Sequence, residues 1–233
     1  DETYVRAEPE QPFGFVAVAA GDGIENMFKD LGTDCGGCMV VRGGQTMNPS
    51  TEDILNAANK INADTIYVLP NNGNIIMASN QAASIIEDKE IIVVPSKTVP
   101  QGISAMINFE ATRNKDENTA AMNEGLSLVK SGQLTYAVRD TSIDGKSINA
   151  GDIMGIDDDG IQSVSVSLVE ATKDLLAHMI DEDSELISIY YGAEVKEEDA
   201  KEFEKYVEET YEDCDVEFNY GGQPIYYYIL SVE

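Results

Sequence analysis

The sequence predicts an α/β protein with two domains. The first is built on a parallel sheet with helices on both faces, and the second is an α+β domain with a mostly antiparallel sheet. Between residues 13 and 113, apolar runs alternate four times with helical stretches, which is typical of a parallel sheet. From about residue 114, apolar and polar residues alternate and Asp-Gly pairs occur, which indicates hairpins. The length of 233 residues is enough for one large or two modest domains.

Four apolar runs rich in β-branched residues are predicted as the strands of the first sheet. The run FGFVAVAAG is apolar almost throughout, which indicates burial on both faces. Each run is followed by a loop in which Gly, Asn, Ser or Thr predominate. The predicted strands are residues 13–21, 38–44, 64–70 and 90–96.

A segment with helical periodicity follows each strand. In GDGIENMFKDLG, Ile24, Phe28 and Leu31 share one face, and a glycine marks the end. Pro49 is predicted to open the next helix, TEDILNAANKI. NNGNIIMASNQAASII is predicted as a turn leading into a helix, and Pro100 fits the first turn of the fourth helix.

The second half is predicted to begin with an amphipathic helix over residues 114–132. Hairpins follow over residues 133–167, with Asp-Gly turns at 144–145 and 159–160. The remaining segments are a helix (168–180), a strand (185–192), a charged helix with Phe203, Val207 and Tyr211 facing inward (196–213), and two strands separated by a Gly-Gly turn (215–233). The expected divisions are therefore an acidic linker (1–12), a parallel-sheet domain (13–113) and an α+β domain (114–233).

The charge balance excludes two classes of partner. Acidic residues outnumber basic ones by 43 to 15, so the formal net charge is −28. Such a surface repels nucleic acid and anionic membranes, which also argues against reading GGQ as a peptide-release signature. No apolar run approaches the roughly 20 residues that span a bilayer. Three cysteines, an odd number, fit a reducing compartment, so we expect a cytoplasmic protein. The absence of an initial Met suggests a piece of a longer chain.

No convincing catalytic or metal-binding set is visible. Cys35 and Cys38 have CxxC spacing, which can mean redox chemistry or half of a zinc site, but a turn of small residues is the favoured interpretation. His178 has no Ser or Asp at a spacing that indicates a triad. The acidic run Asp157–Asp159 is interpreted as a solvated turn rather than a metal site. We expect no catalytic residue, no metal and no cofactor in this chain.

The candidate site lies in the loops that follow the predicted strands, since ligands of open parallel sheets bind at the carboxyl ends of the strands. Ser50 and the free N–H groups of the next helix could hold a carboxylate or phosphate. The simpler alternative is that Asn48 or Ser50 caps the helix and Asn71–Asn74 is only a turn. The candidate ligand- or partner-binding residues are Gly43, Gly44, Gln45, Thr46, Asn48, Ser50, Thr51, Asn71, Asn72, Asn74, Lys97 and Thr98.

Several of these loops resemble a known family. The succession of GDGI, GGQTMNPSTEDI, LPNNGNIIMAS, VPSKTVPQGISAMI and YGGQPIYYYILSVE resembles the C-terminal region of the larger, dihydroxyacetone-kinase-like component of fatty acid kinase, the A-type component. The resemblance runs from about residue 13 to the end. It extends to DegV proteins, the two-domain fatty-acid-binding subunits that serve this kinase. The DegV threonine/serine loop corresponds to Gln45–Thr51, and the loop that meets the lipid carboxylate corresponds to Asn71–Asn74.

The resemblance implies a division of labour. ATP and Mg would act in a separate ATP-binding domain, and this region would recruit the DegV-type subunit that carries the fatty acid. The kinase-type domains are not found in these residues, since no GxxxxGK[ST] run occurs. We therefore expect a non-catalytic docking module of a phosphotransferase, with a homodimer formed through the longer protein as a further expectation.

Departures from the DegV pattern leave an alternative open. Where DegV-type loops use Thr and Ser hydroxyls, this sequence has Gln45, Met47 and Asn72, so the anion site would be altered or lost. The alternative function is a DegV-type protein that itself binds a fatty acid or small anion between its two domains. In that case Ser50, Asn72 and Lys97 would meet the ligand.

Overall fold

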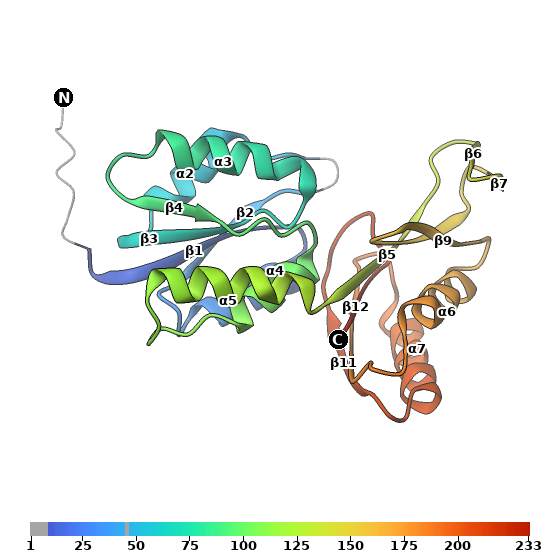
Figure 1. Ribbon diagram of the computed structural model, residues 1–233. Coiled ribbons are helices and arrows are strands. Elements are labelled where there is room, and N and C mark those ends of the chain that lie inside the picture. Colours follow the sequence, from blue (N-terminus) through green and yellow to red (C-terminus); the bar gives the residue numbers. More distant parts are fainter. Residues whose placement is uncertain (1–8, 45–46) are drawn as a thin grey trace. The chain divides into compact units, whose positions relative to one another are not determined.

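The computed structural model describes residues 9–44 and 47–233, which divide into two units by their internal contacts (Figure 1). The first unit contains the chain up to Ala20 and residues Glu25–Leu128, and the second contains Gly21–Ile24 and Val129–Glu233. The sequence placed the division after residue 113. The helix that follows residue 114 is grouped instead with the first unit, because it packs against the helix before it.

The first unit contains a four-stranded sheet in the order β2-β1-β3-β4, with every neighbouring pair parallel. This confirms the parallel sheet predicted from the alternation of strands and helices. Reversal of the strand order at β1 places successive crossovers on opposite faces. The strands are β1 (Gln11–Ala19), β2 (Cys38–Arg42), β3 (Ala63–Leu69) and β4 (Glu90–Val93).

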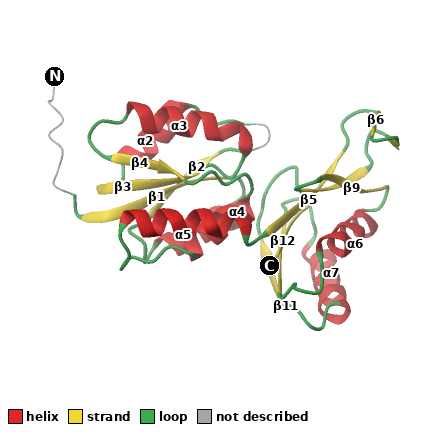
Figure 2. Ribbon diagram, in the orientation of Figure 1, coloured by secondary structure: helices red, strands yellow, loops and turns green. Residues whose placement is uncertain are grey.

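Helices cover both faces of this sheet. Figure 1 shows α2 and α3 on one face and α4 and α5 on the other, and Figure 2 shows the same layers by element type. The helices of this unit are α1 (Asp22–Gly32, whose first residues are grouped with the second unit), α2 (Thr51–Asn59), the short 3-10 helix η1 (Gly73–Ile75), α3 (Ile76–Ile85), α4 (Val99–Ile107) and α5 (Lys115–Ser127).

The end of α5 differs from the sequence prediction. The helix was expected to reach residue 132, but it ends at Ser127 and a strand begins at Lys130. Residues 130–136 pair with one strand on each side, and these long-range hydrogen bonds override the local helical pattern.

Two different cores flank the first sheet. On the side of α2 and α3 the core is aliphatic, with Val16, Ile54 and Val68 fully buried. The aromatic rings of Phe13, Phe15, Tyr67 and Phe109 contact one another in a second cluster. Each fully buried large side chain contributes roughly 1.5–3 kcal/mol. Alternate residues of β1 therefore serve both cores, as its continuous apolar run predicted.

The second unit contains a six-stranded sheet in the order β11-β10-β12-β5-β8-β9. All neighbours are antiparallel except β10 and β11, which are parallel, so the predicted mostly antiparallel sheet is confirmed. Its strands are β5 (Lys130–Tyr136), β8 (Ile153–Asp157), β9 (Gly160–Ser165), β10 (Leu186–Tyr191), β11 (Asp215–Tyr220) and β12 (Tyr228–Val232). The two strands predicted around the Gly-Gly turn do not pair with each other, because β10 lies between them.

Helices α6 (Leu168–Met179) and α7 (Glu197–Thr210) close the core of this unit. Leu175 and Met179 of α6 and Phe203 and Val207 of α7 are buried in one cluster with Leu230 of β12. A separate hairpin, β6 (Thr141–Ile143) and β7 (Lys146–Ile148), turns at Asp144 and Gly145, both with positive φ. This is the Asp-Gly hairpin turn that the sequence predicted.

Candidate functional site

The loop after β2 begins with a tight turn. Gly44 N–H donates to the Met47 carbonyl over 2.9 Å, and Met47 N–H donates back over 3.3 Å. A side chain at Gly43 would place its Cβ 2.5 Å from the Pro49 ring, so only glycine fits there. Gln45 and Thr46, which the sequence proposed for the site, lie outside the described residues.

Ser50 is the N-cap of α2. Its hydroxyl accepts from the Asp53 N–H over 3.1 Å, and the Asp53 carboxylate accepts from the Ser50 N–H over 2.8 Å. These hydrogen bonds to Ser50 hold the pKa of the Asp53 carboxyl below its usual value. The capping box places a carboxylate where an anion was expected. Pro49 precedes the cap and does not form the first turn, and Asn48 is exposed.

Asn71 is held inside the protein. Its side chain is buried, with Nδ2 donating to the Val18 carbonyl over 2.9 Å and Oδ1 accepting from the Ser96 hydroxyl over 2.7 Å. Its φ of 55° is in the left-handed region, which Asn tolerates better than most residues. A Cβ on Gly102 of α4 would lie 2.0 Å from Asn71 Oδ1. Asn71 therefore fastens the ends of three strands and α4 together.

The neighbouring candidates act mainly as caps. Asn72 Oδ1 accepts from the Asn74 N–H over 2.9 Å and caps η1. Thr98 Oγ1 accepts from the Gln101 N–H over 3.2 Å and caps α4, with proline in the first turn as predicted. The side chains of Asn74 and Lys97 are exposed at this edge. A protein-facing role thus takes up the polar groups of most of the predicted site.

Thr51 leads to a different surface. Its hydroxyl donates to Gln81 Oε1 of α3 over 2.9 Å. Gln81 lines a shallow hollow of about 540 Å³ on α3. The hollow is lined by Gly73, Ile76, Met77, Asn80, Gln81 and Ser84. Gly73 belongs to the predicted PNNGN loop, so two of the predicted loops meet at this surface.

An ion pair that the sequence did not reveal lies near the end of β2. Arg42 Nε is 3.0 Å from Glu25 Oε1, and the Glu25 side chain is only 8% exposed. The sequence placed Arg42 at the end of its strand. It gave no sign of the partner, because Glu25 comes from another helix and is 17 residues away in sequence. The buried carboxylate makes this corner less favourable for an anion.

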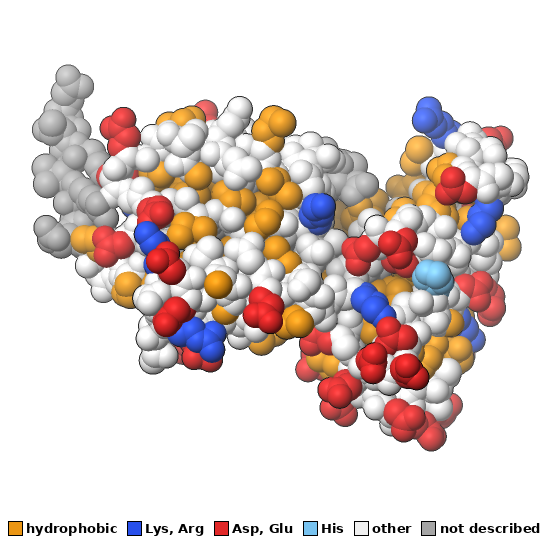
Figure 3. Space-filling model, viewed as in Figure 1, with side chains coloured by type: hydrophobic (Ala, Val, Ile, Leu, Met, Phe, Trp, Pro, Cys, Tyr) orange, Lys and Arg blue, Asp and Glu red, His pale blue; other side chains and the backbone are white. Residues whose placement is uncertain are grey.

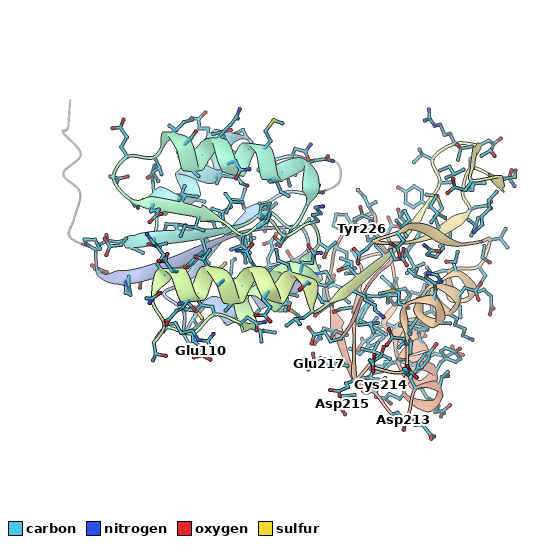
Figure 4. All side chains as sticks on the ribbon, in the orientation of Figure 1. Glu110, Asp213, Cys214, Asp215, Glu217 and Tyr226 are labelled. Carbon is cyan, nitrogen blue, oxygen red and sulfur yellow. The ribbon has the colours of Figure 1, made fainter. Side chains whose placement is uncertain are left out.

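The thiols are held in their protonated forms. Burial raises the pKa of the Cys38 thiol to about 12, and burial together with Asp34 raises that of Cys35. Figure 4 shows Cys214 beside Asp213 and Asp215 near the start of β11, where burial and these carboxylates raise its pKa. A thiol needs a lowered pKa to act as a nucleophile at neutral pH. None of the three therefore meets that requirement.

The remaining polar candidates form local structure. His178 Nε2 lies 3.6 Å from an Asp157 carboxylate oxygen, and the other Asp157 oxygen accepts from the Asp159 N–H over 2.9 Å. This is a turn closed by its own aspartate. In the part of the chain that the structure describes, no group of three or more His, Cys, Asp or Glu side chains is arranged to hold a metal.

The second GGQ sequence is packed into the second unit. Gln223 is 3% exposed and donates from Nε2 to the Tyr190 carbonyl over 3.0 Å. Its Oε1 has no hydrogen-bond partner among the described residues, and a Cβ on Gly221 would lie 2.1 Å from it. Ile225, two residues later, has a φ of 70°, which is strained for a β-branched residue. This segment is a tight structural turn.

Comparisons with known proteins agree over nearly the whole chain. A family model for the C-terminal region of FakA-like proteins, the A-type components of fatty acid kinase, matches residues 14–233. Protein YloV of Bacillus subtilis is 49% identical over 224 residues, which are 96% of this chain and 40% of that protein. A Staphylococcus aureus protein is 42% identical over 218 residues, covering 94% of this chain and 39% of its own length. The chain thus spans about 40% of the length of these curated relatives.

Solved structures share the fold at low sequence identity. A DegV family protein of Corynebacterium glutamicum has a TM-score of 0.68 at 13% identity, covering 95% of this chain and 97% of its own. The Fatty Acid Kinase B3 protein of Streptococcus pneumoniae, loaded with linoleic acid, has a TM-score of 0.63 at 13% identity, covering 96% and 99%. The dihydroxyacetone kinase of C. freundii has a TM-score of 0.62 at 12% identity, covering 97% of this chain and 48% of its own.

Proposed function

We propose that this chain, which belongs to the FakA-like C-terminal family of fatty acid kinase components, is a docking module that recruits a DegV-type fatty-acid-binding protein. The observation that carries the proposal is the family match over residues 14–233, which includes both units. Recruitment would bring the acyl carboxylate to an ATP-binding domain elsewhere in the longer protein. That domain, with its ATP and Mg, would transfer the phosphoryl group to make an acyl phosphate.

The chemistry of the described residues supports a binding role. The thiols are kept protonated, and the His178–Asp157 pair belongs to an exposed turn. The hydroxyls of Ser50 and Thr98 cap helices. A nucleophile needs an adjacent base or a lowered pKa, and neither accompanies these groups. These observations favour contact over catalysis.

The loops also support docking over the DegV-like alternative, in which the chain itself holds a fatty acid or small anion. At the positions that correspond to the DegV carboxylate loops, Asn71 binds the Val18 carbonyl and Ser96. Asp53 occupies the N-terminus of α2 with a negative charge. A second carboxylate at that helix terminus would be repelled. The fold is shared with DegV proteins, while the polar groups of these loops serve the protein itself.

Membrane association is not indicated by the helices. Within residues 9–44 and 47–233, no helix combines the length and the apolar composition needed to cross a bilayer.

The test is a binding measurement with the purified chain. DegV-type proteins from the same organism, each loaded with a fatty acid such as linoleic acid, are titrated with the chain in a calorimeter. We expect a saturable 1:1 complex with at least one of them. In native mass spectrometry, the chain alone is expected to carry no fatty acid. Failure to bind every DegV-type protein would contradict the proposal, and a fatty acid bound to the chain itself would favour the alternative.

A further inference from the structure

We infer that the outward surface of α3, with the adjoining PNNGN loop, is where the DegV-type protein docks. We call this surface the α3 face, and we define it by the residues that line the hollow: Gly73, Ile76, Met77, Asn80, Gln81 and Ser84. The inference rests on the proposed function and specifies where the partner binds.

The α3 face is uncharged in a highly charged chain. Asp, Glu, Lys and Arg make up 25% of the sequence, so a stretch of 22 residues would carry five or six of them. Residues 65–86 carry none. In contrast, α7 has Glu197, Glu198 and Asp199 in its first turn, and Figure 3 shows acidic side chains gathered over that helix. Over α3 the visible side chains are mostly hydrophobic or neutral. Depletion of charge is a mark of interface centres.

Burial does not explain the missing charge. Helix α4 is also uncharged, but most of its residues are buried. In α3 only Ser79 and Ala82 are buried. Met77 is 73% exposed and Ile85 at the end of the helix is 57% exposed. An exposed helix of a monomer with this net charge would normally carry solvating charges on such a face.

The shape and chemistry of the α3 face suit contact with another protein. The hollow lies beside Met77, whose unbranched side chain adapts to a partner surface. Small side chains at Gly73 and Ser84 leave room for a protruding group. The Asn80 side chain is exposed, and no hydrogen bond joins its amide to any other described residue. An amide beside apolar groups can give direction to the contact.

The α3 face is rigidly supported from below. The Thr51 hydroxyl holds Gln81, and the Ser79 hydroxyl donates to the Ile75 carbonyl over 2.9 Å. Ala82 and Ile75 are fully buried in the aliphatic core. The preceding loop is fixed by Asn71. A surface that is already ordered loses little conformational entropy on binding.

Charge complementarity identifies the occupant as an uncharged, partly apolar protein surface. Nucleic acid and anionic lipid headgroups need Lys or Arg, and residues 65–86 contain neither. Anywhere else, an approaching protein meets the field of a chain with net charge −28, whereas the α3 face lets it approach without facing a carboxylate at the contact. The partner that the proposed function provides, the DegV-type protein, is the one we assign to it.

The test introduces a charge at the centre of the α3 face. Asn80→Arg and, separately, Met77→Glu are made in the full 233-residue chain and titrated against the linoleate-loaded DegV-type protein that binds the unchanged chain. Both are expected to weaken binding by at least about 30-fold, because a charge would be desolvated without a partner. The matched control is Asn123→Arg on α5, an exposed helical Asn in the same unit, with an expected change below about twofold. Thermal unfolding checks that all variants remain folded.

The outcomes separate the two proposals. If the unchanged chain binds and both α3 variants bind equally well, the inference is wrong while the proposed function stands. If the unchanged chain binds no DegV-type protein, the proposed function fails first. Sedimentation of the chain alone tests a second copy as the occupant. If the chain self-associates and Asn80→Arg abolishes that association but leaves partner binding intact, the α3 face belongs to a homo-oligomer and the assignment is overturned.

Discussion

Asn71 and Ser96 join the ends of two adjacent parallel strands by a reciprocal pair of hydrogen bonds. The Ser96 hydroxyl donates to Asn71 Oδ1 over 2.7 Å and accepts from the Asn71 N–H over 3.0 Å. Both residues are buried, and the Asn71 amide also reaches β1 through the Val18 carbonyl. The loop that a DegV protein would turn toward its ligand is thus tied to the protein interior.

The first prediction concerns this connection. Asn71→Ala is expected to destabilise the chain by about 2–4 kcal/mol, because buried partners lose their hydrogen bonds and Ala is strained at a positive φ. The control is Asn74→Ala in the same loop, where the side chain is exposed, with an expected change within about 0.5 kcal/mol. Urea unfolding measures both. Equal effects of the two substitutions would show that Asn71 is not a structural connection.

The second prediction concerns the capping box of α2. Ser50→Ala is expected to cost about 1 kcal/mol of stability through loss of the cap. Because the folded-state pKa of Asp53 is lowered, its contribution is present above its usual pKa and is lost as the pH falls through the folded-state value. The stability difference between the unchanged chain and Asp53→Asn should therefore shrink in urea titrations between about pH 6 and pH 2.5. A difference independent of pH would contradict the capping role.

The third prediction concerns the CxxC sequence. Since burial raises the pKa of Cys38 to about 12, its thiol should react with iodoacetamide at about pH 8 at least tenfold more slowly than a thiol in the urea-unfolded chain. The raised pKa stabilises the fold fully below the usual thiol value, and this contribution is lost as the pH rises toward 12. Mass spectrometry of labelled peptides follows each cysteine. Rapid labelling of folded Cys38 would support a reactive thiol instead.

The fourth prediction concerns the strained turn before β12. Ile225 has a φ of 70° and is only partly buried, so Ile225→Gly relieves strain of about 1–3 kcal/mol at the expense of some apolar contact. Its unfolding midpoint is expected to be unchanged or higher. The same substitution at Ile229, which is 7% exposed within β12, should lower stability by about 3 kcal/mol or more. Equal losses at the two positions would rule out strain at Ile225.

Local sequence patterns predicted most of the elements. The alternation of apolar runs and helical faces located β1–β4 and the helices between them, because each element needs one apolar face or stripe. The start of β5 at Lys130 was missed, since its pairing with β12 and β8 depends on residues distant in sequence. For the same reason, the position of β10 between β11 and β12 could not be read from a Gly-Gly turn.

The candidate site was predictable as a set of loops, but not in its hydrogen bonds. The glycine and proline pattern located the turn at Gly43 and the cap at Ser50, which are local features. The sequence did not reveal that Asn71 binds Ser96, 25 positions away, or that Glu25 pairs with Arg42. These contacts arise only when strand ends from separate segments meet at one edge. Gln45 and Thr46 remain predictions, and so does the binding role of the whole set.

The position of β12 also orders events during synthesis. This strand lies between β10 and β5, so residues 228–232 supply the hydrogen bonds that join two halves of the second sheet. While a ribosome is still producing the preceding segment, β5 and β10 each expose an unpaired edge, and neither half can bury its apolar side completely. Nascent chains are therefore vulnerable to mispairing until these five residues emerge, and chaperone dependence should be greatest just before that point.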